Sequence, residues 1–296
     1  MPYVGRFAPS PTGPLHFGSL VAAVASYCDA RANGGQWLVR MEDLDKPREV
    51  KGAADDILRT LEAFGFAWDR EVWYQSQRAE FYESALQTLK DKGLVYPCTC
   101  SRKEIADSAI ASGIESAIYP KTCLKHALKP NAHAAYRALT LDENIAFLDK
   151  IQGEVSQNLA YDVGDFILKR ADGLFAYQLA VVVDDAAQGV THIVRGADLL
   201  DSTPRQIYLQ QLFGFATPHY AHVPVVCNPD GEKLSKQTLA KPIDMRAPGH
   251  ALFDALSFLG QHPPTALTSA MLDEIWRWAI TNWNIANVPK QRKALY

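Results

Sequence analysis

One local arrangement near the start of the chain constrains the fold more than any other feature. A short apolar segment at residues 3–7 precedes a turn rich in proline and glycine, PSPTGPLHFGS at residues 9–19. An alanine-rich stretch follows and ends near Asn33-Gly34-Gly35. This order predicts a strand, a tight turn and the start of a helix. Because the first N–H groups of a helix are unpaired and its dipole is positive there, the arrangement is suited to binding a phosphate.

A second segment, far away in the sequence, supplies positive charge. KLSKQ at residues 233–237 follows Gly231 and carries Lys233 and Lys236 on either side of Leu234 and Ser235. We expect a loop whose lysines contact phosphates. The alternative is a solvated surface turn, which is the usual environment of lysine side chains.

Beyond these two segments, the first part of the chain alternates between apolar and amphipathic stretches. Residues 37–45 predict a buried strand with polar residues at its exit, and residues 53–64 and 79–90 predict amphipathic helices. Alternation of this kind is typical of a parallel sheet covered by helices. The sequence therefore predicts an α/β fold.

The second half of the chain interrupts this pattern and then resumes it. Residues 97–138 are irregular, and residues 139–184 predict a strand-rich stretch that includes the apolar run 175–183. A further strand–helix section at 192–226 leads to the lysine loop, and the pattern becomes helical beyond residue 241. We expect a nucleotide-binding domain split by one insertion and followed by a small helical region.

The composition is that of an ordinary globular protein and excludes several classes. A chain of 296 residues, 48% hydrophobic and 21% charged, should bury roughly three-quarters of its unfolded surface. The net charge of −3 does not indicate a nucleic-acid binder, although a local basic surface would suffice for one. No apolar run approaches the ~18 residues of a membrane span, and we recognise no signal peptide. Five cysteines, an odd number, then favour a reducing, cytoplasmic environment.

Four ordered blocks resemble one family of enzymes. HFGS and KLSKQ resemble the His-x-Gly-His and Lys-Met-Ser-Lys-Ser signatures of class I aminoacyl-tRNA synthetases. RFAPSPTGPLHFGSL near the start, LVRMEDLDKPR at 38–48 and a long block at 164–206 are similar to the glutamyl- and glutaminyl-tRNA synthetase subgroup. The resemblance covers residues 1–242. It departs from the signature at Leu234, in place of methionine, and at Gln237, in place of the final serine.

The resemblance implies a fold and a domain order. We expect a Rossmann-like parallel sheet split by a zinc-bearing insertion, plus a small helical C-terminal region. The first half of the catalytic domain is expected at 1–90, the acceptor-type insertion at 91–177 and the second half, with the KLSKQ loop, at 178–240. A helical, stem-contact-like region is expected at 241–296, with no anticodon-binding domain. The implied reaction makes an acyl adenylate from an amino acid and ATP, accompanied by Mg²⁺.

His16, Gly18, Ser19 and Lys236 are the expected ATP-binding residues. His16 begins the first helix, where its imidazole can donate to phosphates, and the missing side chain of Gly18 lets adenosine approach the backbone. Lys236 would contact the phosphates as charge develops in the transition state, while Lys233 shapes or closes the loop. His16, Gly18, Lys233 and Lys236 are therefore the expected catalytic residues. HFGS alone is a weak signal, because ordinary capped turns and nucleotidyltransferases share it.

The resemblance and the chemistry of the residues together indicate glutamate as the amino acid. Glutamate carries two carboxylates and one ammonium, so its pocket needs cationic donors and an acid. Arg6 and Arg195 offer planar guanidiniums suited to carboxylates, and Tyr177 adds a hydroxyl donor. Glu42 can hold the ammonium. The pocket is completed by Ser10 and by the backbone of Arg6, Phe7, Ala8, Pro9 and Ser10.

By the resemblance, Arg195 separates glutamate users from glutamine users. Glutamine would leave a buried guanidinium without its anion, a loss on the order of 3–5 kcal/mol. Considered without the family blocks, buried arginine–carboxylate pairs also arise for structural reasons, and Arg40, Arg48 and Arg205 are candidates for that. Tyr177 on an apolar strand would by itself more often be a core residue.

A cluster of three cysteines in the insertion indicates a metal site. Cys98, Cys100 and Cys123 provide three thiolates, and a fourth ligand would complete a tetrahedral Zn²⁺ site. Their spacing differs from that of zinc ribbons, and small buried thiols are the alternative. Tyr119, His126 and His133 are candidates for the fourth ligand. The resembled glutamyl-type enzymes carry a Cys-x-Cys…Tyr-x-x-x-Cys zinc site, which implies Tyr119 and a structural role.

The length of chain after the lysine loop indicates a particular acceptor. Glutamyl-tRNA synthetases continue with a long anticodon-binding region, whereas a short segment follows Lys241 here. This architecture resembles shortened paralogues that activate glutamate without tRNA and transfer it to queuosine in the anticodon of tRNA(Asp). The implied partners are ATP, L-glutamate and queuosine-containing tRNA(Asp), whose loop offers splayed bases. No heptad pattern is evident, and we expect a monomer.

Three other functions compete with this interpretation. A short synthetase charging the 3′ end of a tRNA would need anticodon-independent recognition. A non-catalytic paralogue that binds RNA should have lost phosphate-binding groups, yet His16, Gly18, Lys233 and Lys236 are all present. A small-molecule adenylyltransferase would not need the glutamate-binding residues together.

Overall fold

The centre of the molecule is a parallel sheet assembled from two distant parts of the chain. The computed structural model describes residues 2–101, 103–106, 118–125, 133–234 and 241–296. Strand β1 (Val4–Phe7) pairs in parallel with β2 (Gln36–Met41), and β9 (His192–Gly196) pairs in parallel with β10 (His219–Val223). The two pairs lie side by side, with β1 next to β9: the Thr191 N–H, just before β9, donates to the Val4 carbonyl of β1 at 2.9 Å. The predicted α/β fold class, with its parallel sheet covered by helices, is confirmed.

The strand–turn–helix at the start of the chain forms as the sequence predicts. All four residues of β1 are buried, and helix α1 (Phe17–Ala32) begins directly after the turn. His16 is the N-cap residue, and its Nδ1 accepts a hydrogen bond from the Ser19 N–H at 3.3 Å. Ten residues of α1 are buried, most of them small or β-branched, so the helix packs closely between the sheet and the C-terminal helices. The turn and the helix N-terminus are thereby fixed against the sheet.

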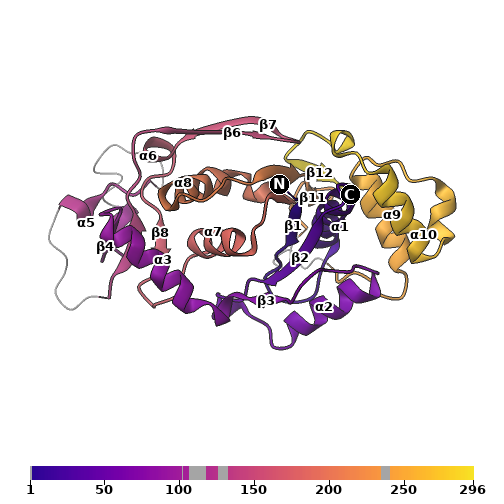
Figure 1. Ribbon diagram of the computed structural model, residues 1–296, viewed down its shortest axis with the longest axis horizontal. Helices are drawn as coiled ribbons and strands as arrows, with labels where there is room; N and C mark the ends of the chain where they lie inside the picture. The colour runs from indigo at the N-terminus through magenta and orange to yellow at the C-terminus, as the bar shows by residue number, and fades with distance from the viewer. Residues whose placement is uncertain (1, 102, 107–117, 126–132, 235–240) are drawn as a thin grey trace.

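The insertion contains a small antiparallel sheet and a long hairpin. Strands β4 (Val95–Cys98), β5 (Ala135–Ala138) and β8 (Ile167–Lys169) form the sheet. The hairpin of β6 (Asn144–Asp149) and β7 (Gly153–Asn158) extends over α8 (Thr203–Phe213) and reaches back to the central sheet (Figure 1). There Asp149 lies opposite Tyr220 of β10. The hairpin therefore places one of its residues against the central sheet.

The apolar run at 175–183 is a helix, so the prediction of a strand there was wrong. Helix α7 (Tyr177–Gln188) begins at Tyr177 and ends at Gly189, which adopts a left-handed conformation with φ of 70°. Its residues from Leu179 to Asp185 are all buried, because α7 packs between α3 (Ala79–Asp91) and α8. A segment buried on all sides has no polar face, and its periodicity cannot separate helix from strand.

Two C-terminal helices pack on α1 and extend the main core. Trp276 lies against Tyr27 and Phe66, with ring centroids 4.8 Å apart in both cases, and its indole N–H donates to the Phe64 carbonyl. The predicted domain boundaries stay predictions, since one core cluster joins α1 to these helices.

The remaining α-helices and strands are α2 (Ala53–Ala63), β3 (Trp73–Tyr74), α3 (Ala79–Asp91), α5 (Thr122–Lys125), α6 (Leu159–Asp162), α8 (Thr203–Phe213), β11 (Val225–Cys227), α9 (Pro248–Phe258), α10 (Leu272–Asn282) and β12 (Lys293–Leu295).

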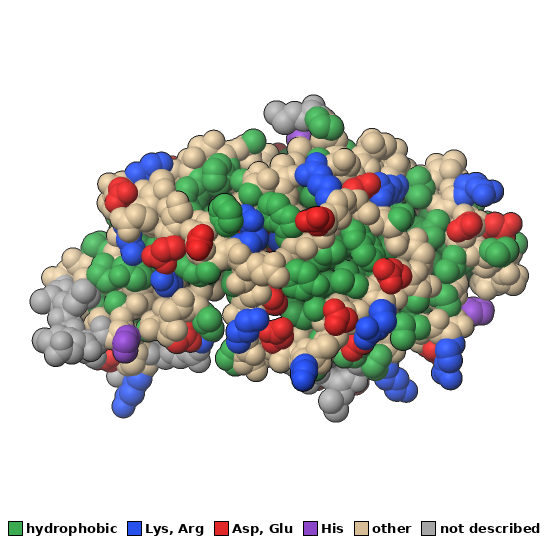
Figure 2. Space-filling view, turned by 60° about the horizontal axis from the view of Figure 1, so that its bottom comes forward, with side chains coloured by type: hydrophobic (Ala, Val, Ile, Leu, Met, Phe, Trp, Pro, Cys, Tyr) green, Lys and Arg blue, Asp and Glu red, His purple; other side chains and the backbone are tan. Residues whose placement is uncertain are grey.

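The surface carries charges of both signs. On the face shown in Figure 2, acidic and basic side chains are interspersed, and neither sign forms a continuous patch. Within the described part of the chain, no helix combines the length and the apolar character that crossing a membrane requires. Any recognition of a charged partner on this face would therefore depend on local groups rather than on a broad field.

Truncation of Trp276 should test the packing of α10 on the main core. We expect Trp276→Ala to lower the free energy of unfolding by about 3–5 kcal/mol, because a large buried ring and its hydrogen bond are lost. Arg277→Ala is the matched control: Arg277 is exposed on the same helix, and its loss should change stability by less than about 0.5 kcal/mol. Urea denaturation measures both. Equal stability of the two variants would contradict the assignment of α10 to the core.

Candidate functional site

One cavity of about 800 Å³ opens at the carboxyl ends of the central strands. Ligands of open parallel sheets usually bind at this edge. Residues at or just beyond the ends of β1, β2, β9 and β10 all contribute to its wall. The described candidate residues that line it are Arg6, Phe7, Ala8, Pro9, Ser10, His16, Gly18, Ser19, Glu42, Tyr177, Arg195 and Lys233. The structure thus brings together every predicted ATP- and amino-acid-binding residue that lies in the described part of the chain.

Arg6 is held at one side of the cavity by a buried acid. Its Nε donates to Asp185 Oδ1 at 3.1 Å, and Nη2 donates to Oδ2 at 3.4 Å. Arg40, which is fully buried, donates to the same Asp185 carboxylate at 2.8 Å. Burial alone would raise the pKa of Asp185, but the two guanidiniums outweigh it and hold the pKa below its ordinary value. With Nε and Nη2 occupied, Nη1 of Arg6 has no partner among the described residues and is left for a ligand.

Glu42 follows β2 and lies beside the same arginines. Its side chain is 9% exposed and accepts a hydrogen bond from Arg40 at 3.3 Å. Burial raises the pKa of Glu42, and the attraction of Arg40 and Arg6 offsets only part of that effect. A carboxylate in this situation gains most from a cation that enters the cavity.

Arg195 lies on β9, the strand beside β1, and its guanidinium is fixed by four contacts. Nε donates to His222 Nε2 at 3.0 Å, and Nη1 donates to the Tyr177 hydroxyl at 3.2 Å. Nη2 donates to Thr203 Oγ1 at 2.9 Å and to the Leu199 carbonyl at 3.5 Å. One N–H of Nη1 is therefore left for a ligand, next to the O–H of Tyr177. This pair of donors suits a carboxylate.

A buried acid–imidazole pair stands behind Arg195. His222 Nδ1 lies 2.6 Å from Asp149 Oδ2, and both side chains are fully buried. Burial lowers the pKa of His222 to about 4, with the hydrogen bond to Asp149 opposing this effect and Arg195 adding to it. The imidazole is therefore neutral at physiological pH.

The side of the cavity that the sequence predicts to bind phosphates is formed by the first turn and by the start of the lysine loop. Ser19 Oγ lies 3.2 Å from His16 Nε2, and a side chain at Gly18 would lie within 3.5 Å of the Leu234 carbonyl. Lys233 forms an ion pair with Asp198 at 2.6 Å. The two signature segments are thus adjacent in space. Lys236, with Ser235 and Gln237, lies outside the described residues, and its role stays a prediction.

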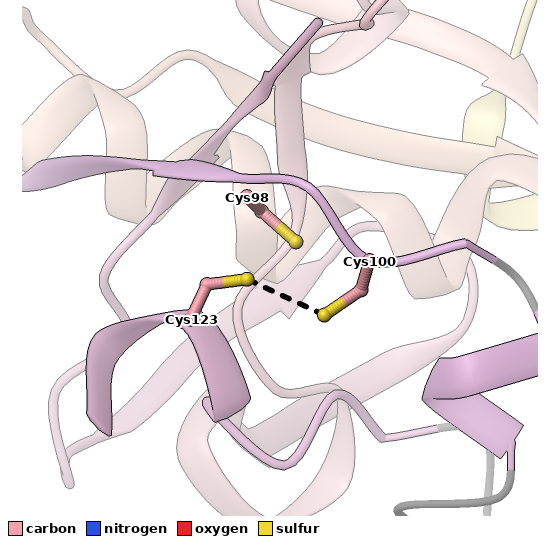
Figure 3. Close-up of side chains that lie close together, drawn as sticks. All are labelled: Cys98, Cys100 and Cys123. Atoms are coloured by element: carbon pink, nitrogen blue, oxygen red, sulfur yellow. Dashed lines mark hydrogen bonds between the residues drawn. The ribbon is translucent and has the colours of Figure 1, made fainter. Parts of the chain in front are cut away.

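The three cysteines of the insertion converge on one point (Figure 3). Their sulfurs lie within 4.8 Å of one another, and Cys100 and Cys123 are 3.3 Å apart. Metal–sulfur bonds of about 2.3 Å in a tetrahedron give sulfur–sulfur distances of roughly 3.8 Å, so the cluster could hold a metal. The Tyr119 hydroxyl lies 3.3 Å from Cys98 Sγ and 3.6 Å from Cys100 Sγ. Hydrogen bonding outweighs burial at Cys123 and lowers its thiol pKa to about 7.

Tyr119 is thus well placed as the fourth ligand, among the candidates the structure describes. His133 does not join the metal-ligating group, and His126 lies outside the described residues. The guanidinium of Arg137 lies 4.0 Å from the centroid of the Tyr119 ring, while burial and the hydrogen bonds with the cysteines raise the pKa of the phenol. Cys28 and Cys227 are buried elsewhere in the core, as the sequence predicts.

The fold and this site define a class of protein. Residues 3–247 match the family described as tRNA synthetases class I (E and Q), catalytic domain. The chain therefore belongs to the class I tRNA synthetases and is a ligase. It is 26% identical to a glutamate tRNA ligase from Elizabethkingia meningosepticum, solved in complex with its amino acid, with a TM-score of 0.82. That match covers 100% of this chain and 67% of the other.

Relatives of much higher identity share one name. The chain is 58% identical over 293 residues to the Glutamyl-Q tRNA(Asp) synthetase of Aromatoleum aromaticum, covering 99% of this chain and 92% of the relative. It is 59% identical over 292 residues to the protein of the same name from Dechloromonas aromatica, covering 98% and 97%. The similarity therefore extends through the insertion and the C-terminal helices.

The structure also shows site residues that the sequence analysis missed. Asp185, His222 and Thr203 each hold an arginine of the cavity, and Asp149 holds His222. Arg40, which the sequence suggested as a structural residue, joins Glu42 to Asp185. The acidic pair at 184–185 interrupts an otherwise apolar run, and this was a usable signal. No comparable signal marks Asp149, because His222, its side-chain partner, is 73 residues away in the sequence.

Glu42 and Asp185 should respond in opposite ways to removal of their charge. Glu42→Gln should leave the melting temperature unchanged or raise it, since the raised pKa means that ionisation costs the folded state free energy. This cost appears as the pH rises through the pKa that Glu42 has in the unfolded chain, because above that pH the unfolded chain ionises more readily than the folded protein. Asp185→Asn should lower the free energy of unfolding by about 3–5 kcal/mol. The pKa of Asp185 is lower in the folded protein than in the unfolded chain, so its ionised carboxylate stabilises the fold above the pKa of the unfolded chain. This stabilisation is lost as the pH falls through the pKa of the folded protein.

Melting temperatures of the two variants between pH 4 and pH 8 measure this difference. Both carboxylates contact Arg40, so each serves as the control for the other. A strong loss of stability in Glu42→Gln at neutral pH would show that this carboxylate is a structural partner of Arg40.

Proposed function

We propose that the protein activates L-glutamate with ATP, without requiring tRNA, and transfers it to the queuosine base in the anticodon of tRNA(Asp). One observation carries the first step: Arg6, Arg195, Tyr177 and Glu42 face a single cavity that also contains the phosphate-binding turn. The names of the close relatives support the acceptor.

The charges of the cavity complement glutamate. One carboxylate is bound by Nη1 of Arg195 with the Tyr177 hydroxyl, and the other by Nη1 of Arg6 with Ser10 and the turn backbone. The ammonium is bound by Glu42, whose desolvated carboxylate has most to gain from a cation. Glutamine would leave the Arg195 charge unpaired, at a cost on the order of 3–5 kcal/mol. The pocket therefore selects for the second carboxylate.

ATP occupies the other side of the cavity. Its phosphates lie at the N-terminus of α1, near His16 and Ser19, with adenosine against Gly18. Lys233 and Lys236 approach from the second signature segment, and Mg²⁺ accompanies the nucleotide. Adenylate formation needs the glutamate carboxylate to be aligned with the α-phosphate, so positioning and charge stabilisation account for most of the catalysis.

The metal of the insertion is zinc, bound by Cys98, Cys100, Tyr119 and Cys123. Three sulfur ligands suit Zn²⁺, and a site with four protein ligands leaves no position open for chemistry. The role is structural, because Tyr119 also bridges to Gly164 and so links α5 to the segment before β8. The metal braces the module that lies beside the incoming RNA.

Transfer of radiolabelled glutamate is the decisive experiment on the acceptor. With ATP, label should appear on tRNA(Asp) that contains queuosine and not on the same tRNA with guanosine at that position. The label should be lost when periodate has cleaved the queuosine diol beforehand. Label on the 3′ end, or on tRNA(Glu), would instead indicate a short synthetase, an alternative that the similarity to a glutamate tRNA ligase favours.

Metal content should follow the cysteine cluster. We expect about one zinc per chain by mass spectrometry of the purified protein, and loss of that zinc in Cys123→Ser. Cys28→Ala, which removes a buried thiol remote from the cluster, should keep the metal. Chelation should expose the region around Cys98 to proteolysis. A metal-free preparation with unchanged stability would contradict the zinc site.

A further inference from the structure

Three buried side chains from different parts of the chain form a continuous line behind the cavity. Asp149 lies at the end of β6 in the insertion, His222 on β10 and Arg195 on β9. The exposed fractions of the Asp149 and His222 side chains are zero, and that of Arg195 is 4%. Neither Asp149 nor His222 lines the cavity, so Arg195 is their connection to a ligand.

The hydrogen bonds determine which nitrogen of His222 carries the proton. Asp149 Oδ1 accepts from the backbone N–H groups of Ile151, Gln152 and His222 at 2.8–3.1 Å. Oδ2 is therefore the acceptor for His222 Nδ1–H at 2.6 Å. Nε2 then has a lone pair, which accepts from Arg195 Nε at 3.0 Å. In the opposite tautomer, the Nε2–H of His222 would face the Nε–H of Arg195, and two donors would meet without an acceptor between them.

This line of contacts sets the rotation of the Arg195 guanidinium. With Nε fixed on His222 and Nη2 on Thr203, the plane of the group is determined and Nη1 faces Tyr177. If the guanidinium turned out of this plane, the N–H of Nη1 that remains for a ligand would no longer have the orientation set by these contacts. Affinity for a planar carboxylate depends on that orientation.

We propose that Asp149 and His222 are positioning residues for the amino-acid substrate, which act by holding Arg195 in its carboxylate-binding orientation. The inference rests on the proposed function, because it assumes that the substrate carboxylate binds at Arg195. The β6–β7 hairpin is thereby a functional part of the amino-acid site. Its turn at 149–152 anchors the carboxylate that orients His222.

A purely structural Asp–His pair would have different consequences. Its loss would lower stability and the fraction of active protein, and would affect both substrates to the same degree. A positioning pair instead changes the KM for glutamate while the KM for ATP stays nearly constant. ATP binds at the other side of the cavity, away from Arg195.

Steady-state ATP–pyrophosphate exchange on the full chain separates these cases. In Asp149→Asn, the amide oxygen must face the three backbone N–H groups, so its NH₂ group faces His222 and reverses the tautomer. We expect the KM for glutamate to rise about 10- to 100-fold, the loss of one hydrogen bond to a charged group. The KM for ATP should change less than ~2-fold, since ATP makes no contact with this pair.

Substitutions of His222 provide a rescue test that does not depend on Asp149. His222→Leu removes the acceptor for Arg195 Nε and should raise the KM for glutamate as much as Asp149→Asn. His222→Gln places an amide oxygen near the position of Nε2, and most of the affinity for glutamate should return. His219→Gln, on the same strand but exposed, is the matched control and should leave both KM values unchanged.

The ¹⁵N resonances of His222 in the folded protein report on the tautomer without any assay of activity. We expect a protonated Nδ1 and an unprotonated Nε2 between pH 6 and pH 8, and the reverse in Asp149→Asn. A protonated Nε2 in the wild-type protein, or equal loss of affinity for ATP and glutamate in the variants, would overturn the proposal. Absence of glutamate-dependent exchange in the wild-type protein would instead overturn the proposed function, and the resonances would still test the geometry.

Discussion

The buried ion cluster between β2 and α7 is the interaction on which the rest of the structure depends. Arg40 is fully buried and reaches Asp185 at 2.8 Å and Asp184 at 3.8 Å, across a separation of about 145 residues in the sequence. Asp184 is in turn held by Gln75, Arg78 and Tyr82. Buried charges are tolerated only when partners satisfy them, so every member restricts its neighbours. The cluster therefore fixes α7 against the sheet and, with it, both Arg6 and Tyr177.

The charged groups of the cavity suit different parts of the proposed substrates. The guanidiniums of Arg6 and Arg195, on the neighbouring strands β1 and β9, are held through Nε by an acid and an imidazole respectively, and each keeps an N–H of Nη1 for a ligand. Glu42 provides a carboxyl group whose pKa is raised by burial, so a cation that enters the cavity would favour its ionised form. The phosphate side relies on backbone N–H groups and lysines, which do not discriminate between amino acids. In the proposed function, selectivity for an amino acid and use of ATP therefore depend on different groups.

The insertion contributes both the cysteine cluster and a residue that lies against the central sheet. Its antiparallel sheet carries the cysteine cluster, where Tyr119 contacts two of the sulfurs. Its hairpin returns to the central sheet and places Asp149 under His222. In the proposed function, the module that carries the metal site therefore also supports the amino-acid site. This arrangement provides a physical route by which the position of the insertion affects the orientation of Arg195.

Local features of the chain determined the elements near its start, and tertiary contacts decided the rest of the site. Residues 3–35 carry their own strand, turn and cap signals, so β1, α1 and the position of His16 were predictable. The resemblance of the sequence blocks also identified the residues that line the cavity. Helix α7 was misassigned because burial on all sides removes the polar face that reveals periodicity. Asp149, His222 and Asp185 acquire their roles only from partners distant in the sequence, and only the folded sheet brings those charges within hydrogen-bonding distance.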